Sequence, residues 1–220
     1  DQEKECGQGI YNMSITIVMI WQWLITQREE MRSMWEFCHW LLVSSATVKE
    51  KDDALDALFL AVKDYIIKLS REELDDIEAN KGFMILNYAT NLEHCGDIID
   101  KSLIELIRKK IHQNDHFSDE GFAEIKNFYS TVMEHFQLSQ NVFLNGDEEF
   151  AQKLIDGKKK LKLAEKATAQ NHMKRLKTSN AATIATSELH MDVIRDLRRI
   201  NTYVSSVAYT ILEKGPESTY

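Results

Sequence analysis

Four carboxylates in the sequence have the spacing of metal ligands on helices. Glu93 and Asp97 are four residues apart, and Asp52 and Asp56 have the same spacing. Residues four apart lie on one face of an α-helix, where two like charges repel each other unless solvent or a cation screens them. On neighbouring antiparallel helices the two pairs could supply four carboxylates to one hard cation or to a multinuclear cluster.

The alternative for the same carboxylates is a solvated acidic face, because 28% of the residues are charged. A general acid–base pair is disfavoured, since no Gly-rich loop, nucleophile elbow or oriented histidine accompanies these side chains in the sequence. A metal-dependent phosphohydrolase is also disfavoured, because the acidic pairs lack a basic clamp for phosphate. The sequence therefore predicts no enzyme.

The elements that position these carboxylates are predicted to be helices. The sequence holds one proline, Pro216, and only 8 glycines, so little in the body of the chain interrupts a helix. Leu, Ala, Glu, Lys, Met and Ile dominate over alternating β-branched runs, which favours an all-α fold. With 220 residues, 44% of them hydrophobic, the chain can bury one sizeable core or two small cores.

The turn signals divide the chain into six helices. The first three are predicted at about residues 11–43, 47–69 and 71–112. The fourth begins at Ser118, an N-cap followed by acidic first-turn residues, and the fifth follows Asn145-Gly146-Asp147. The sixth is predicted from about Ile184 to Glu213.

The order of the helices indicates an internal duplication within one domain that spans residues 1–220. Repeat one covers about residues 11–112, repeat two covers about 118–213, and residues 214–220 form a tail. Three antiparallel helices in each repeat, joined by short loops, predict a six-helix bundle with small crossing angles.

The net charge of -8 and the three cysteines limit the partners and the compartment. A net negative chain is a poor ligand for phosphate backbones, so nucleic acid is excluded as a partner. Cys6, Cys38 and Cys95 are odd in number and far apart, which favours free thiols in a reducing compartment.

The apolar segment Ile15 to Ile25 is shorter than a membrane-spanning helix, so a buried core helix is favoured over an interfacial one. The chain begins with Asp1 rather than Met, which leaves room for a membrane domain upstream.

Several segments of the sequence resemble a known family. Leu92-Glu93-His94-Cys95-Gly96-Asp97 resembles the Leu-Glu-Arg-Ile-Gly-Asp motif of PhoU-like proteins, and Asp52 to Leu58 resembles their partner motif. The PhoU-like C-terminal domain of bacterial sodium/phosphate cotransporters is resembled by Asn91 to Leu106, by Ser118 to Gly121 and above all by Leu189 to Asn201, continuing through Val207-Ala208-Tyr209. The resemblance covers roughly residues 47–212 and implies the same six-helix, two-repeat bundle.

The resemblance also implies metal binding and a role in phosphate transport. By it, the metal ligands are Asp52, Asp56, Glu93 and Asp97, with Asp53 and Asp100 as lesser candidates. The implied cofactor is a divalent or iron-type metal ion, because carboxylate oxygens suit magnesium, calcium, manganese and iron alike.

The function that the resemblance implies is a regulatory domain of a sodium-dependent phosphate transporter, non-catalytic and at the cytoplasmic face of the inner membrane. Its expected partner is the membrane transport domain of the same or a partner chain, with a homo-oligomer as a further expectation. The alternative is a freestanding PhoU-type regulator of phosphate uptake and signalling.

The second repeat departs from the acidic pattern. Aligning its helices with those of the first repeat places Arg198 at Glu93 and Thr202 at Asp97. It also places Asp156 at Asp52 and Lys160 at Asp56. Two positive charges in these positions predict that the second repeat does not bind a metal ion there.

Other charged residues are interpreted as structural. Glu188, Asp192 and Asp196 are interleaved with arginines and are predicted to form ion pairs. His172 and His190 are predicted to be surface or hydrogen-bonded core histidines. The basic run Lys158 to Lys162 is interpreted as a solvated helix face, with contact to anionic lipid headgroups or free phosphate as the alternative.

Overall fold

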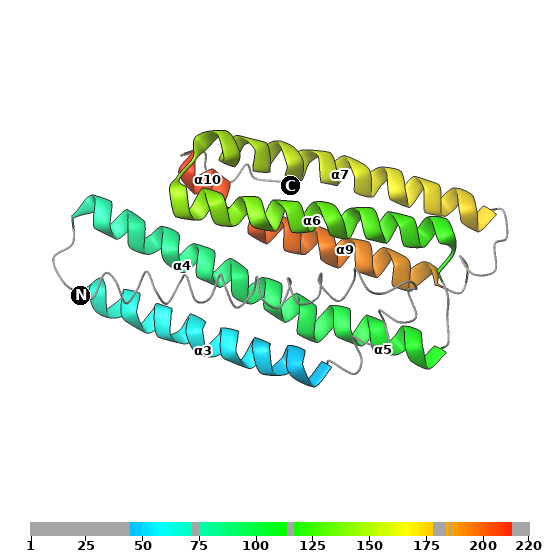
Figure 1. Ribbon diagram of the computed structural model, residues 1–220, viewed down its shortest axis with the longest axis horizontal. Coiled ribbons are helices and arrows are strands. Elements are labelled where there is room, and N and C mark those ends of the chain that lie inside the picture. Colours follow the sequence, from blue (N-terminus) through cyan, green and yellow to red (C-terminus); the bar gives the residue numbers. More distant parts are fainter. Residues whose placement is uncertain (1–44, 72–74, 114–116, 178–183, 185, 213–220) are drawn as a thin grey trace. The chain divides into compact units, whose positions relative to one another are not determined.

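The computed structural model describes residues 45–71, 75–113, 117–177, 184 and 186–212, and these residues form helices without a strand (Figure 1). The all-α prediction is confirmed. The predicted first helix, at residues 11–43, lies outside the described residues, as do Ile15 to Ile25, Cys6 and Cys38. No helix in the described part of the chain is long and apolar enough to cross a membrane.

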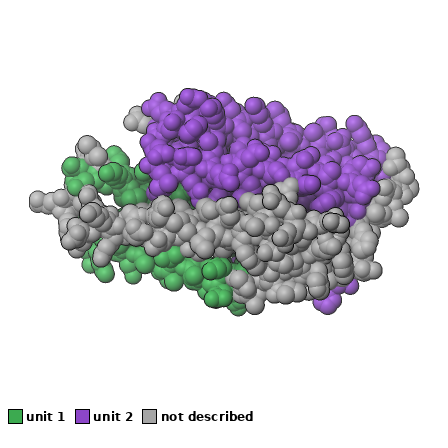
Figure 2. Space-filling model, viewed as in Figure 1, with its two compact units in different colours: residues 1–100 green, residues 101–220 purple. Residues whose placement is uncertain are grey.

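The chain divides into two compact units, which Figure 2 shows in different colours: unit 1, Asp1–Asp100, and unit 2, Lys101–Tyr220. The division falls inside the segment 71–112 that the sequence predicts as one helix. It therefore does not coincide with the predicted repeat boundary at residues 112–118, and the two-repeat organisation stays a prediction.

Unit 1 contains a helical hairpin of α3 (Ser45–Leu69) and α4 (Asp76–Asp97). A Cβ added at Gly96 would meet Asp52 and Leu55, and one added at Gly82 would meet Ile66. Gly96, at the end of α4, thus lies near the start of α3, and Gly82, nearer the start of α4, lies near the end of α3. The two helices are therefore antiparallel.

The start of α4 lies beyond the predicted Arg71 because of a capping box. The Asp75 carboxylate accepts from the backbone N–H of Glu78 at 2.8 Å, and the Glu78 carboxylate accepts from the backbone N–H of Asp75 at 3.1 Å. The two reciprocal bonds satisfy N–H groups that a helix leaves open at its first turn.

The predicted third helix contains a π-helical segment, which separates two α-helices. After α4 the chain forms a π-helical segment, Ile98–Leu103, and then continues as α5 (Ile104–Gln113). Ile98 and Ile99 are buried at the start of this segment. A π segment holds about one residue more per turn than an α-helix, so the residues before and after it do not follow one continuous α-helical spacing.

Unit 2 contains α6 (Asp119–Asn145), α7 (Glu148–Lys177), α9 (Ser187–Val204) and the short α10 (Val207–Ile211), and α6 packs against both α7 and α9. Two predicted boundaries are confirmed. Ser118 caps α6 by accepting from the backbone N–H of Gly121 at 3.2 Å, and Gly146 ends it in the left-handed conformation, with φ of 64°. A glycine adopts this conformation without the steric cost of a Cβ.

The predicted sixth helix is divided into α9 and α10. The break lies at Ser205 and Ser206, where the Ser206 hydroxyl donates to the Tyr203 carbonyl at 2.7 Å. One turn earlier the Thr202 hydroxyl donates to the Arg198 carbonyl at 3.0 Å. Hydroxyl groups that bond back to the preceding turn compete with the helical ladder and bend helices.

Candidate functional site

The predicted ligand Asp52 is buried in unit 1, where α3 lies close to Gly96 of α4. Its side chain is 6% exposed. A Cβ built on Gly96 would lie 2.7 Å from Asp52 Oδ1 and 2.6 Å from Leu55 Cδ2, so only a glycine leaves room for them. Gly96 lies between Glu93 and Asp97, and the buried carboxylate therefore faces the turn of α4 that bears the other predicted pair.

The remaining predicted ligands have different surroundings. Asp56, Asp97 and Asp100 are half-buried, whereas Asp53 is exposed. Glu93 is half-buried and contacts the Nδ1 atom of its neighbour His94 at 2.9 Å.

Within the described residues, no group of three or more His, Cys, Asp or Glu side chains is arranged to hold a metal ion. Metal binding by Asp52, Asp56, Glu93 and Asp97 therefore stays a prediction, as does the choice of metal.

Cys95 lies beside these carboxylates in the core of unit 1. Its side chain is buried and carries a thiol. Burial, with a smaller contribution from the negative charge of Glu93, raises the pKa of the thiol far above its usual range. Cys95 is therefore protonated and packs as a small apolar side chain of the core.

In unit 2, one of the residues aligned with the predicted metal ligands of unit 1 forms an ion pair instead. Arg198, aligned with Glu93, contacts Glu165 through Nε at 2.9 Å. Asp156, aligned with Asp52, is exposed and accepts from Gln152 Nε2 at 3.1 Å, and Lys160 is also exposed. The buried carboxylate of unit 1 thus has no counterpart at Asp156. Arg198 pairs with an acid of α7 that the alignment does not include.

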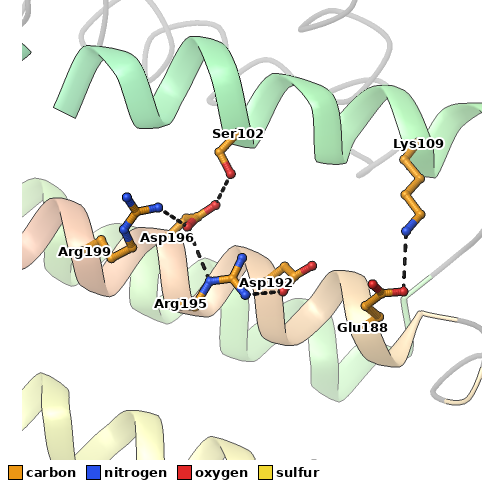
Figure 3. A network of polar contacts seen from close by, with 7 residues as sticks. All are labelled: Ser102, Lys109, Glu188, Asp192, Arg195, Asp196 and Arg199. Carbon is orange, nitrogen blue, oxygen red and sulfur yellow. Dashed lines mark hydrogen bonds and ion pairs between the residues drawn. The ribbon is translucent and has the colours of Figure 1, made fainter. Parts of the chain in front are cut away.

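The acidic residues of α9 form the ion pairs that the sequence predicts (Figure 3). Asp196 is fully buried, accepts a hydrogen bond from the Ser102 hydroxyl, and contacts Arg199 Nη1 at 3.1 Å and Arg195 Nε at 3.7 Å. Asp192 pairs with Arg195 at 2.6 Å.

At the other end of this network, Glu188 lies 3.5 Å from Lys109 of α5, so ion pairs and hydrogen bonds join α9 to two different segments of unit 2.

A second polar cluster in unit 2 joins α6, α7 and α9. The rings of His172 and His190 are stacked with their centroids 5.0 Å apart. Glu124 accepts two hydrogen bonds from Arg175, at 2.7 and 3.0 Å, and lies 3.2 Å from His190 Nε2. His172 Nε2 lies 2.7 Å from the Ser187 hydroxyl. Both histidines are buried, as predicted for core histidines.

Burial favours the neutral form of both histidines of this cluster. Burial is the largest cause that lowers the pKa of His190, to about 4, and Glu124 partly opposes it. Burial and the nearby Arg175 also lower the pKa of His172. Two neutral rings can stack, whereas two imidazolium rings at this distance would repel each other.

A third buried contact, between α6 and α9, lies beside a glycine of α7. His135 Nδ1 is 2.6 Å from the Asn201 side-chain oxygen. A Cβ built on Gly157 would lie 2.2 Å from His135 Nε2, so this ring fits only against a glycine. No local motif of the sequence points to the contacts of His135, Asn201, Glu124 and Arg175, because helix packing brings these residues together.

Comparison with known proteins agrees with the fold. Residues 125–211 match the family model of the PhoU domain. The chain is similar to YjbB, a candidate inorganic phosphate export protein by its name. It is 32% identical over 162 residues to the protein of Salmonella typhimurium, and 30% identical over 165 residues to that of Escherichia coli K12. These alignments cover 74% and 75% of the chain, but the chain spans only 30% of the length of either relative.

Among solved structures, the fold is similar to that of PhoU from Pseudomonas aeruginosa, with a TM-score of 0.78 at 14% sequence identity. The match covers 97% of this chain and 96% of that one. The chain therefore has a PhoU-like fold, and its residues 125–211 match the PhoU domain.

Proposed function

We propose that the chain is the non-catalytic regulatory part of a phosphate-transport protein and acts by contacting a membrane-embedded transport part. The observation that carries this proposal is the similarity to YjbB along three quarters of the chain, together with the PhoU-like fold. The name of YjbB describes export of inorganic phosphate, and most of its length lies outside the similar region. That remaining length is where we place the transport function.

The polar contacts of unit 2 support a regulatory role. Asp196, Glu124 and Arg198 each pair with side chains from another helix or segment. Such contacts hold several helices in one arrangement, so that a partner bound to one helix influences the others. We place the chain at the cytoplasmic face of the inner membrane, and we retain sodium coupling and a metal ion at Asp52 and Glu93 as parts of the proposal.

A freestanding PhoU-type regulator is the second candidate. The observation in its favour is that the structural match covers 96% of the PhoU chain from Pseudomonas aeruginosa, so this fold occurs as a nearly complete chain of similar extent. A regulator of this kind would bind a transporter or a sensor kinase encoded separately.

Phosphate efflux from bacterial cells tests the two candidates. The affinity-tagged chain is co-expressed with a YjbB protein from which the similar region has been deleted, and release of radioactive phosphate is measured in sodium and in potassium medium. We expect the chain to co-purify with the truncated transporter and to change the efflux rate. Unchanged efflux without co-purification contradicts the transporter proposal. A change in a phosphate-starvation reporter under those conditions favours the freestanding regulator.

A further inference from the structure

One face of α7 has a charge opposite to that of the whole chain. Between residues 159 and 177 this helix exposes six lysines, which we call the α7 lysine face: Lys159, Lys160, Lys162, Lys166, Lys174 and Lys177. The chain as a whole has a net charge of -8. This helix face is therefore locally positive on a chain that is negative as a whole, and the helix lies along α6 in unit 2 (Figure 1).

The face is not neutralised by acids of its own helix. In this part of α7 the one acidic residue is Glu165, which is half-buried and paired with Arg198 at 2.9 Å. Lys158 is directed elsewhere, because its Nζ atom donates to the Tyr209 hydroxyl at 3.2 Å and lies 4.8 Å from the centre of that ring. Lys158 is therefore not part of the exposed lysine face, and the exposed lysines continue along α7 as far as Lys177.

Two large apolar side chains lie among the lysines. Leu163 is 65% exposed and Met173 is 56% exposed. The opposite side of α7 is anchored in unit 2 by Leu161, Thr168 and His172, which are buried. Exposed lysines around protruding apolar side chains are the pattern of a helix that lies at a membrane surface, because lysine stems can lie on apolar surface while their ammonium groups reach the phosphates.

We propose that the α7 lysine face docks on an anionic lipid bilayer, with Leu163 and Met173 in the headgroup layer. Charge complementarity carries the choice of partner. A negative bilayer repels most of an acidic chain and attracts this face, so electrostatics both bind and orient unit 2. The inference goes beyond the proposed function, because a regulator that reaches its transporter through protein contacts alone does not need a lipid-binding face.

Vesicle co-sedimentation of the full chain tests the proposal. Binding is compared between vesicles of one-third phosphatidylglycerol in phosphatidylcholine and vesicles of phosphatidylcholine alone, so that the difference reports on charge. We expect a triple variant, Lys159→Gln, Lys160→Gln and Lys166→Gln, to lower the partition coefficient for anionic vesicles on the order of tenfold to a hundredfold. Raising the salt from about 0.1 M to about 1 M should release the wild-type chain, because the screening length falls from about 10 Å to about 3 Å.

The matched control removes three exposed lysines from unit 1: Lys63→Gln, Lys68→Gln and Lys81→Gln. It has the same net charge as the triple variant and should bind like the wild type. A second pair of variants tests the apolar contribution, with Leu163→Gln expected to weaken binding and Leu60→Gln, at a residue 56% exposed on α3, expected to leave it unchanged.

Four outcomes overturn the proposal. The first is an equal loss of vesicle binding in both triple variants, and the second is equal binding of the chain to anionic and neutral vesicles. The third is release of the chain from vesicles by millimolar inorganic phosphate but not by chloride at matched ionic strength. The fourth is retention of the chain on immobilised polyglutamate without binding to vesicles. The third would assign the face to free phosphate, and the fourth to an acidic protein. Since the assay contains no transport step, its failure is separate from failure of the efflux experiment.

Discussion

The two units stabilise buried carboxylates in different ways. In unit 2 the buried Asp196 is surrounded by groups of the chain itself, with Arg195 and Arg199 supplying positive charge and Ser102 a hydrogen bond. In unit 1 the buried Asp52 lies instead against the backbone of α4 at Gly96, on the turn that bears Glu93. The difference shows that a buried carboxylate can be accommodated either by charged and hydroxyl side chains around it or by a glycine that lets the neighbouring helix come close.

The glycine contacts should give the largest effects on stability, and they compare the two units directly. Gly96→Ala in unit 1 and Gly157→Ala in unit 2 each force a Cβ to within 2.7 Å of a buried side chain. We expect each to lower the free energy of unfolding by about 2–3 kcal/mol, as overpacking does.

Gly82→Ala is the matched control for these glycines, because its Cβ would meet Ile66 at an ordinary 3.8 Å. In the middle of α4 an alanine should stabilise the helix by up to about 1 kcal/mol. Urea denaturation measures all three variants. A Gly96→Ala protein as stable as Gly82→Ala would contradict the close approach of α3 and α4.

The histidine cluster should make the stability of unit 2 sensitive to acid. In the unfolded chain His190 takes up a proton near its ordinary pKa of 6.5, whereas in the folded chain its pKa is about 4. The unfolded state therefore binds more protons between these values, and stability falls as the pH falls from about 6.5 to about 4. We expect a loss on the order of 2 kcal/mol.

Unfolding measured along a pH series tests this effect against two variants. His190→Gln should reduce the pH dependence in this range, whereas His112→Gln, at an exposed position, should preserve it. An unchanged pH dependence in His190→Gln would show that the cluster is not the source.

Neutralising the buried acid of unit 2 should have a smaller effect. Asp196→Asn removes the charge between Arg195 and Arg199, and we expect a loss of about 1–2 kcal/mol because both arginines reach solvent and are not left fully buried. Asp192→Asn changes a surface pair with Arg195 and should cost less than about 0.5 kcal/mol. Thermal unfolding of the two variants measures the difference, and equal losses would show that burial of Asp196 does not matter.

Metal binding should have a modest effect on stability and give the sharpest difference between the units. We expect divalent metal in protein purified without chelator, and about 1.4 kcal/mol of stabilisation at a free metal concentration ten times the Kd. Elemental analysis should find the metal lost in an Asp52→Asn, Glu93→Gln double variant. It should be retained in an Asp156→Asn, Glu188→Gln variant of unit 2. Equal metal content in wild type and the first variant would rule out the predicted site.

The sequence predicts the helical elements well where a local signal exists. Ser118 and Gly146 each form their capping hydrogen bond with a residue about one helical turn away. Their roles at the two ends of α6 can therefore be predicted from neighbouring residues. The division into α9 and α10 is missed, because serine and threonine bend a helix only when their hydroxyls bond back to the preceding turn. The start of α4 differs from the predicted Arg71, because the capping box of Asp75 and Glu78 sets the first turn.

The candidate sites depend on contacts that spacing alone does not specify. The acidic pairs of α3 and α4 are visible in the sequence because each pair lies on one helix. By contrast, Arg175 and Glu124 are 51 residues apart and meet only when α7 packs on α6. The burial that lowers the pKa of His190 likewise belongs to the packed helices rather than to the residue.

The π-helical segment Ile98–Leu103 has a consequence for how this chain compares with its relatives. A π segment accommodates a single inserted residue without turning the helices on either side. Chain length can therefore vary by one residue at this point during evolution while α4 and α5 keep their faces. An alignment of this helix with the corresponding helix of another protein of PhoU-like fold should allow a one-residue gap there. Without the gap, every position after Ile98 would be aligned one residue out of register.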